Sequence, residues 1–393
     1  MSNAGRLPST SGVGSRASDY LGHRRVVIKA GTSVLTQPPD HQALNLVVMG
    51  DLVRQICDLR RWGAEAVLVT SGAIAAGRES LGTGQNEGNR DIPTRQVMAA
   101  VGQSRLMHTY QELFATHGVQ VAQTLLTIGD LSDRQSYLNL RNTIQGLLEL
   151  GVVPILNEND VVAVDEIGEV FGDNDRLSAL AANLVDADLL VILTDIDGLY
   201  TADPNVDPTA QFIAQVDQVD VSVESVAGKN RNAWARGGMP TKLEAARLVT
   251  TSGISMVMCR GLVEDAVLKA ARGEAIGTLF KPGAGKLEAR KRWMIGSISH
   301  QVGVMVDAGA ARALRENNRS LLPAGITEVN GEFGRGDIVY ISDQEGRRIA
   351  CGIVNYGSVD VGRIRGLRSG QIPETLGYDY GQEAVHRNNL VLL

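Results

Sequence analysis

The chain has 393 residues, of which 44% are apolar and 21% are charged, and its formal net charge at pH 7 is −6. This length is enough for two or three domains, and this composition is that of an ordinary globular protein. The acidic balance argues against broad electrostatic attraction to nucleic acid or anionic lipid. No apolar run is long enough to suggest a membrane-spanning helix.

The N-terminal segment and the cysteines indicate the expected compartment. Residues 1–23 are rich in Ser and Gly and lack the apolar stretch of a signal peptide, so they are predicted to form a flexible tail. The three cysteines and six histidines are scattered, with no Cys-x-x-Cys pair. They form neither a disulfide framework nor a zinc motif. Free cysteines fit a reducing compartment, and we therefore expect a cytoplasmic protein.

From residue 25 the chain alternates short β-branched runs with longer amphipathic runs. The short runs predict strands at 25–30, 66–72, 119–126, 152–157, 189–195 and 254–259. The amphipathic runs predict helices at 43–62, 95–117, 136–150, 176–187, 240–252 and 262–272. Most strand runs lack in/out alternation, as expected when helices cover both faces of a parallel sheet. The pattern predicts an α/β domain, with an open, mostly parallel sheet sandwiched by helices and ligands beyond the strands' carboxyl ends.

The C-terminal part has a different pattern of predicted elements. The segment 279–296 breaks the alternation with Pro, Gly and a run of basic residues, and residues 284–296 are predicted to be a linker. Beyond them, short strand-like runs separated by Gly turns predict a small β-rich domain over residues 297–393. Residues 296–393 hold 10 Arg, no Lys and 11 acidic residues, so their net charge is about −1. Binding to a phosphate backbone normally needs a basic face, which this balance does not favour.

Small polar turns follow the first two predicted strands. The first strand ends in Lys29-Ala30-Gly31, where a Gly lets backbone N–H groups approach an anion and the Lys adds positive charge. This spacing matches neither a P-loop nor a dinucleotide fingerprint, and a strand-end turn with a solvated lysine accounts for it by itself. The second strand ends in Ser71-Gly72, which suits a carboxylate or phosphate, or only a helix cap.

Acidic and amide side chains gather after the fourth predicted strand. Asn157 and Asp160 come at its end, and Asp173-Asn174-Asp175 follow just before a helix. The second group is contiguous rather than alternating, which excludes an EF-hand loop. A helix cap needs only one or two such residues. The surplus favours a functional role, either binding an ammonium group or holding a catalytic lysine in place.

Two further segments suit a nucleotide. The fifth strand ends in Thr194-Asp195, an acid and a hydroxyl that fit a nucleotide or a magnesium shell, or simply end the strand. A helix then opens with the segment Arg236, Gly237, Gly238, Met239, Pro240, Thr241 and Lys242. Paired glycines let the backbone approach phosphate. A lysine in the first turn is unfavourable beside the positive end of the helix dipole, which indicates that it binds a nearby anion. Two lysines near Gly-rich turns, with acids at strand ends, indicate phosphoryl transfer.

The chain resembles the glutamate 5-kinases of the amino acid kinase superfamily over about residues 24–283. The resemblance is carried, in order, by the motifs VVIKAGTSVLT, VTSGAIAAGR, AAVGQSRL, PILNENDVVA, GDNDRLSALAA, LLVILTDIDGLYTADP and GGMPTKLEAA. The segment from about residue 297 resembles the PUA domain of many bacterial members, in SLLPAGITEVNGEFGRGDIV and GYDYGQEAVHRNNLV. The ordered series is specific, whereas each motif alone is not.

This resemblance implies an activity and a set of site residues. The activity is ATP-dependent phosphorylation of the L-glutamate side-chain carboxylate to L-glutamyl 5-phosphate, with Mg²⁺, as the first step of proline biosynthesis. The implied catalytic residues are Lys29, Lys242 and Asp175, with Asp175 holding the lysines in register. The implied glutamate-binding residues are Ser71, Asn157, Asp160, Asp173 and Asn174. The implied ATP contacts are Lys29, Thr194, Asp195 and residues 236–242, and no metal is assigned to protein side chains.

The resemblance also implies partners. Proline is expected as an inhibitor, glutamyl phosphate reductase as a functional partner, and a homodimer or homotetramer by analogy with the superfamily. Nucleic acid and membrane partners are not expected. Two positions depart from the family pattern: Arg236 replaces a small residue, and Pro240 replaces Ser. Pro240 removes one backbone N–H from the nucleotide turn, so these two residues are expected to change the detailed geometry of ATP binding but not the reaction.

Two alternatives remain. One is another amino acid kinase, acting on aspartate, acetylglutamate, carbamate or a nucleoside phosphate. The other is an RNA-associated protein acting through its PUA domain. The pairing of NEND with GDND, together with the C-terminal domain, favours the glutamate kinase. A carboxylate acceptor is already ionised at neutral pH, since free Glu has a pKa of about 4.3. The reaction therefore needs no general base, in keeping with the absence of a candidate histidine.

Overall fold

The computed structural model describes residues 22–37, 43–82, 92–163, 174–204, 206–220, 223, 238–283, 285, 302–317 and 319–393. These form two compact units: one contains the described residues up to 125 with 147–249 and 254–281, and the other contains 126–146, 250–253 and 282–393. The predicted tail (1–23) and linker (284–296) lie almost wholly outside the described residues. The proposed domain bounds, 24–283 and 297–393, stay predictions.

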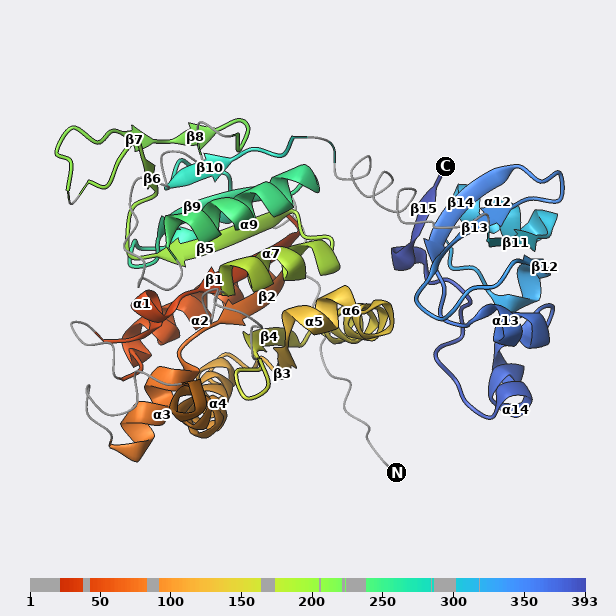
Figure 1. The fold of residues 1–393 in the computed structure, drawn as a ribbon, viewed down its shortest axis with the longest axis horizontal. Helices are drawn as coiled ribbons and strands as arrows, with labels where there is room; N and C mark the ends of the chain where they lie inside the picture. Colours follow the sequence, from red (N-terminus) through yellow and green to blue (C-terminus); the bar gives the residue numbers. More distant parts are fainter. Residues whose placement is uncertain are drawn as a thin grey trace, which may run out of the picture. The chain divides into compact units, whose positions relative to one another are not determined.

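The first unit is built on an eight-stranded sheet in the order β3-β4-β2-β1-β5-β9-β10-β8 (Figure 1). Its strands are β1 (Arg25–Ala30), β2 (Glu65–Thr70), β3 (Val121–Leu126), β4 (Val153–Glu158), β5 (Leu189–Thr194), β8 (Gln215–Val216), β9 (Ser255–Arg260) and β10 (Thr278–Phe280). Strands β4, β2, β1, β5 and β9 run parallel, and β10 runs antiparallel to β9. A separate antiparallel pair is formed by β6 (Leu199–Tyr200) and β7 (Phe212–Ile213).

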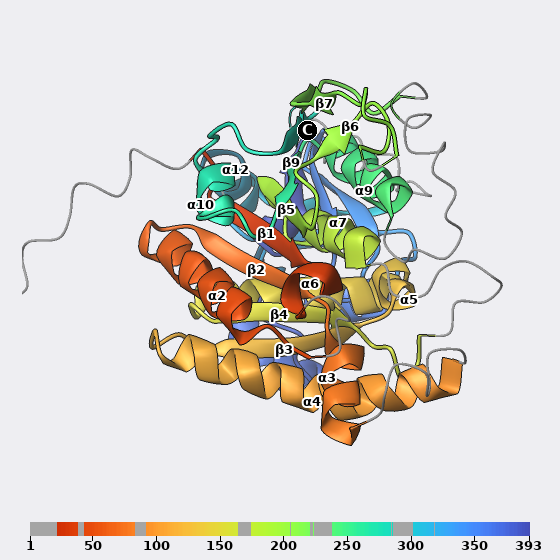
Figure 2. The same ribbon diagram turned by 90° about the vertical axis from the view of Figure 1, so that its left-hand side faces the viewer.

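Helices cover both faces of this sheet. They are α1 (Thr32–Leu35), α2 (Leu46–Arg61), α3 (Ala73–Leu81), α4 (Ile92–Ala115), α7 (Asn174–Leu184), α9 (Met239–Thr251) and α10 (Ala266–Ala271). In the view of Figure 2, α7 and α9 lie on one side of the sheet and α2 and α10 on the other. Every residue of β5 is buried, as its unbroken apolar run predicts. The expected mostly parallel sheet between helices is confirmed.

The prediction was wrong for one strand. The run 119–126 reads as a buried strand, but β3 is the edge strand of the sheet and only Leu126 in it is buried. Gln120, Gln123 and Thr124 interrupt this run, and such polar positions suit a strand at the edge rather than the centre of the sheet. The short elements α1, β6, β7, β8 and β10 also escaped prediction, because two to four residues are too few to show a period.

The second unit contains a five-stranded sheet in the order β12-β11-β13-β14-β15. Its elements are β11 (Gly303–Val306), α12 (Ala308–Asn317), β12 (Ile326–Asn330), β13 (Ile338–Ser342), β14 (Arg348–Ile353), α13 (Ser358–Ile364), α14 (Ile372–Leu376) and β15 (Leu390–Leu392). The unit also includes α5 (Ile128–Ser132) and most of α6 (Arg134–Glu149). Leu138 of α6 packs with Cys351, Ile353 and Val391 of this sheet. The predicted strand-rich C-terminal domain is confirmed.

Two further findings concern the described part of the chain. None of its helices combines the length and the apolarity needed to cross a membrane. Cys57, Cys259 and Cys351 are all buried free thiols.

The register of the parallel strands determines where the polar turns lie. Ala30 of β1 pairs with Thr70 of β2 and with Leu193 of β5. On the far side of β2, Val69 pairs with Leu156 of β4. These strands therefore end at one edge of the sheet, and the turns that follow them lie next to one another. Chemistry at this edge is the expectation for an open parallel sheet.

Candidate active site

Asp175 lies in the first turn of α7 between two lysine ammonium groups. Lys29 Nζ is 2.5 Å from Asp175 Oδ1, and Lys242 Nζ is 3.1 Å from Asp175 Oδ2. Asp175 is fully buried, and Lys29 and Lys242 are only 6% and 8% exposed. Buried charges are tolerated when they are paired, so these three side chains form one ionic unit. Within this unit two positive charges face one negative charge, which suits a site for an anion.

Two opposing effects determine the protonation state of Asp175. Burial on its own would raise the pKa of this carboxyl group, because it disfavours the charged form. The ammonium groups of Lys29 and Lys242 outweigh burial and hold the pKa below its ordinary value. Asp175 is therefore an anion at neutral pH and can accept hydrogen bonds from both lysines at once.

The turns around the two lysines are built from small residues. Lys29 is near the end of β1, and a Cβ added to Gly31 would lie 3.3 Å from Lys29 Nζ. Lys242 is in the first turn of α9, directly after Thr241. The Thr241 hydroxyl lies 2.8 Å from the Gly238 carbonyl oxygen and 3.1 Å from Asp175 Oδ2. Any side chain larger than Gly at position 31 would crowd the ammonium group of Lys29.

Pro240 fits the helix that carries Lys242. Helix α9 begins at Met239, so Pro240 occupies its first turn, where backbone N–H groups have no partner within the helix. The proline therefore removes no hydrogen bond from α9 itself. Arg236 and Gly237 lie outside the described residues, whereas Gly238, Met239 and Thr241 are all partly buried.

A chain of side-chain amides leads away from Asp175. Asn174 Nδ2 lies 2.8 Å from the Thr70 carbonyl oxygen, 2.8 Å from Ser71 Oγ and 3.1 Å from Asn157 Oδ1. Asn157 Nδ2 in turn donates to Gln103 Oε1 at 2.8 Å. Asn174 Oδ1 is buried and accepts no hydrogen bond in the described part of the chain. The structure thus brings Ser71, Asn157 and Asn174 together beside Asp175. Asp173 lies outside the described residues.

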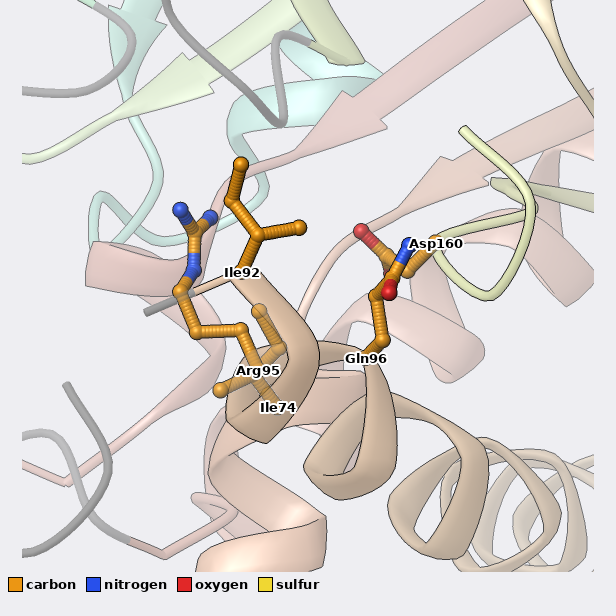
Figure 3. A pocket seen from close by; sticks show the side chains of 5 residues that line it. All are labelled: Ile74, Ile92, Arg95, Gln96 and Asp160. Atoms are coloured by element: carbon orange, nitrogen blue, oxygen red, sulfur yellow. The ribbon is translucent and has the colours of Figure 1, made fainter. Parts of the chain in front are cut away.

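Asp160 lines a small pocket together with Ile74, Ile92, Arg95 and Gln96 (Figure 3). Figure 3 draws the Arg95 guanidinium and the Asp160 carboxylate on opposite sides of this pocket. Burial lowers the pKa of Arg95, while the charges of Asp160 and Glu158 act in the opposite direction. The pocket therefore combines apolar walls with both a positive and a negative group. Such a lining suits a small zwitterion.

Thr194 and Asp195 lie at the end of β5, next to β1. Thr194 is buried and donates from its hydroxyl to Asp195 Oδ1 at 3.0 Å, whereas Asp195 is exposed. The Thr194 carbonyl oxygen accepts from the backbone N–H of Gly261 at 2.8 Å. In the described ranges, no group of three His, Cys, Asp or Glu side chains is arranged to hold a metal ion.

Besides the residues that line the Asp160 pocket, three residues at the site were not predicted from the sequence. Gln103 of α4 accepts from Asn157, and the carbonyl oxygen of Thr70 accepts from Asn174. Thr70 Oγ1 lies 2.8 Å from the Tyr110 hydroxyl, whose pKa is raised by burial. Gln103 belongs to the AAVGQSRL motif, but a glutamine inside a helix has no chemical signature. A backbone carbonyl leaves no trace in the sequence at all.

Comparison with known protein families matches both units. Residues 24–260 match the model of the amino acid kinase family, and residues 303–376 match the model of the PUA domain. The chain therefore belongs to the amino acid kinase family, in agreement with its parallel sheet and its lysine–aspartate cluster.

Relatives within that family are similar along almost the whole chain. A glutamate 5-kinase of Dehalococcoides mccartyi is 50% identical over 94% of this chain and 99% of its own length. Those of Herpetosiphon aurantiacus and Moorella thermoacetica are 49% and 48% identical, again over 94% of this chain, and over 98% and 96% of their own lengths. Within the amino acid kinases, the chain belongs with the glutamate 5-kinases.

Proposed function

We propose that this chain transfers the γ-phosphoryl group of ATP to the side-chain carboxylate of L-glutamate, giving L-glutamyl 5-phosphate and ADP. The observation that carries the proposal is the buried ionic unit of Lys29, Asp175 and Lys242 at the carboxyl edge of a parallel sheet. The names of relatives about 50% identical to this chain support the same reaction.

The proposed mechanism is positioning and charge stabilisation. A carboxylate oxygen of glutamate attacks the γ-phosphorus, and the bond from phosphorus to the β,γ-bridging oxygen breaks, leaving its electron pair on ADP. Negative charge spreads over the three equatorial oxygens of the transferring group. Lys29 and Lys242 would stabilise this charge, and they need no rearrangement because Asp175 already holds both ammonium groups.

The acceptor substrate would bind along the amide chain and the Asp160 pocket. Asn174 Oδ1 is a buried acceptor that no described residue occupies, and Asp160 is an acid in a pocket, so both suit an ammonium group. Ser71 accepts from Asn174 and can donate its own proton to a carboxylate. Asn157 and Asp173 would complete this site.

The nucleotide would bind at the end of β5 and the start of α9, at Lys29, Thr194, Asp195 and residues 236–242. Magnesium is proposed to enter as part of MgATP, because Mg²⁺ is usually bound by substrate phosphates with one or two carboxylates and several waters. The KM for ATP measures the effect of Arg236 and Pro240 on nucleotide binding.

Regulation, location and assembly are proposed from family resemblance. Proline is proposed to inhibit the enzyme, and glutamyl phosphate reductase to consume its reactive acyl phosphate product. The protein is further proposed to be cytoplasmic and to form a homodimer or homotetramer. Inhibition by proline in the activity assay, and the solution mass from light scattering, test two of these proposals.

The reaction is tested with MgATP and each of L-glutamate, L-aspartate and N-acetyl-L-glutamate, while hydroxylamine traps any acyl phosphate as a hydroxamate. We expect ADP release and hydroxamate with L-glutamate alone. Activity with only another acceptor would keep the phosphoryl-transfer class but overturn the substrate. No activity with any acceptor would overturn the reaction.

A further inference from the structure

The hydrogen bonds beside Asp175 have a direction that a backbone atom determines. The carbonyl oxygen of Thr70 can only accept, so Asn174 must turn its NH₂ group toward it. The same NH₂ group faces Asn157 Oδ1, which leaves Asn157 Nδ2 to donate to Gln103. Each amide in the chain is thereby oriented by the one before it.

This direction determines which groups at the two ends of the hydrogen-bonded series of side chains can still donate. Ser71 Oγ accepts from Asn174 and keeps its own proton for another acceptor. At the other end, the side-chain oxygen of Gln103 accepts a hydrogen bond from Asn157. Its Nε2 group is buried without a hydrogen-bond partner in the described part of the chain. A buried donor without a partner is unfavourable, and folded proteins retain few of them. Both ends therefore present donors.

The position of Gln103 is fixed by close packing of its helix. The preceding residue, Gly102, lies against the first turn of α3, where an added Cβ would be 1.8 Å from the Ala73 carbonyl oxygen and 2.3 Å from the Gly77 backbone nitrogen. Helix α3 begins directly after Ser71 and Gly72. Gln103 is thus held on a rigid helix next to the strand end that carries Ser71.

We propose that Gln103 is a further substrate-binding residue, whose Oε1 accepts from Asn157 and whose Nε2 donates to the carboxylate of glutamate that does not react. This inference rests on the proposed function. The reacting carboxylate belongs near Lys29 and Lys242, which contact Asp175. Gln103 is separated from Asp175 by Asn174 and Asn157, so its donor serves the other end of a dicarboxylate substrate.

The test compares Gln103→Met with the wild-type full-length enzyme. Methionine keeps the length and volume of the side chain but cannot donate. Gln111→Met is the control, because Gln111 lies on the same helix and is exposed. Values of kcat and KM are measured for ATP, for L-glutamate and for 4-aminobutyrate, which lacks the α-carboxylate. Where 4-aminobutyrate turns over too slowly, its inhibition constant against L-glutamate replaces its KM.

We expect Gln103→Met to raise the KM for L-glutamate by about tenfold or more, as expected for a lost hydrogen bond to a charged group. The KM for ATP and the constant for 4-aminobutyrate should change less than about threefold, and Gln111→Met should match the wild type. An equal rise in the constants for L-glutamate and 4-aminobutyrate would mean that Gln103 has only a structural role. An unchanged KM for L-glutamate would remove it from the site.

Two results separate this inference from the proposed function. If the wild type forms hydroxamate from L-glutamate and Gln103→Met equals Gln111→Met, only the role of Gln103 is overturned. If the wild type forms none, the reaction and the role of Gln103 are both overturned. Gln103→Glu measured at pH 9 adds a second check, since it keeps an acceptor for Asn157 but replaces the donor by an anion. Wild-type affinity for L-glutamate in that variant would contradict donation by Nε2.

Discussion

Asp175 is the residue on which the positions of both lysines depend. Its two oxygens are each taken by one ammonium group, so a single buried carboxylate determines how far apart the two positive charges lie. The lysines come from β1 and α9, elements about two hundred residues apart in the chain. A lysine side chain is otherwise flexible. Preorganisation of these cations is therefore a property of one residue in α7.

Replacing either lysine tests their role in the reaction. Lys29→Ala and Lys242→Ala should each lower kcat by about 10²–10³, the usual loss when one preorganised donor is removed from a developing charge. Initial rates of hydroxamate formation at saturating L-glutamate and MgATP measure this, with circular dichroism to verify folding. Lys281→Ala is the control, because Lys281 is exposed and pairs only with Asp217 among the described residues. Folded variants with wild-type turnover would refute the catalytic assignment.

The sequence indicated part of this site for identifiable reasons. Lys29 and Lys242 stand beside Gly-rich turns, and the surplus of acids around Asp175 exceeds what a helix cap needs. The site residues that were not predicted act through a backbone carbonyl or an ordinary amide side chain, and such groups occur throughout every protein. The Thr70 carbonyl is backbone, and Gln103 is a polar residue in a long helix whose inward face appears only once α4 is packed. Tertiary packing, rather than local pattern, selects such residues.

Among the elements, α3 and α4 form the closest helix pair at the site, and glycine makes this possible. An added Cβ on Gly77 would lie 1.9 Å from the Met98 carbonyl oxygen, and one on Gly102 would lie 1.8 Å from that of Ala73. Distances this short mean that the two backbones touch. Helix α4 can then bring Gln103 to Asn157 and Tyr110 to Thr70.

Gly102→Ala should therefore destabilise the first unit. The methyl group meets a backbone atom rather than a flexible side chain, so α4 must shift, at a cost of about 1–3 kcal/mol for overpacking. The change is measured as a lower midpoint of thermal unfolding, together with a higher KM for L-glutamate. Gly50→Ala in α2 is the control, because an added Cβ there makes only ordinary contact with Leu113. That control should be neutral or slightly stabilising, and equal midpoints for both variants would contradict close packing at Gly102.

Element prediction succeeded where burial imposes a long pattern and was wrong where it does not. The unbroken apolar runs of β1, β2, β4, β5 and β9 predicted buried parallel strands. The run in β3 is interrupted by Gln123 and Thr124, and this strand lies at the sheet edge. Helix α4 begins at Ile92, three residues before its predicted start, because its first turn, which opens with the exposed Ile92 and Pro93, shows no apolar period.

For the whole molecule, the stability of the fold and the proposed activity depend on the same buried charges. The first unit contains Lys29, Asp175 and Lys242 in its interior, where an unpaired charge is strongly unfavourable. Conversion of Asp175 to a neutral group would leave two lysines without their shared partner. The unit should therefore unfold more easily whenever Asp175 loses its charge, whether by substitution or by protonation.

The expected pH dependence follows from the lowered pKa of Asp175. Since its folded pKa lies below the ordinary value of 3.8, ionised Asp175 stabilises the folded state fully above about pH 5. That contribution disappears as pH falls from the ordinary value through the folded one. At pH 7, Asp175→Asn should lower the free energy of unfolding by about 3–5 kcal/mol, as for other broken buried pairs. Urea unfolding of wild type and Asp175→Asn at pH 7, 5, 4 and 3 should give a difference that is constant down to pH 5 and then narrows. A difference that stays the same to pH 3 would mean that the paired lysines do not lower the pKa of Asp175.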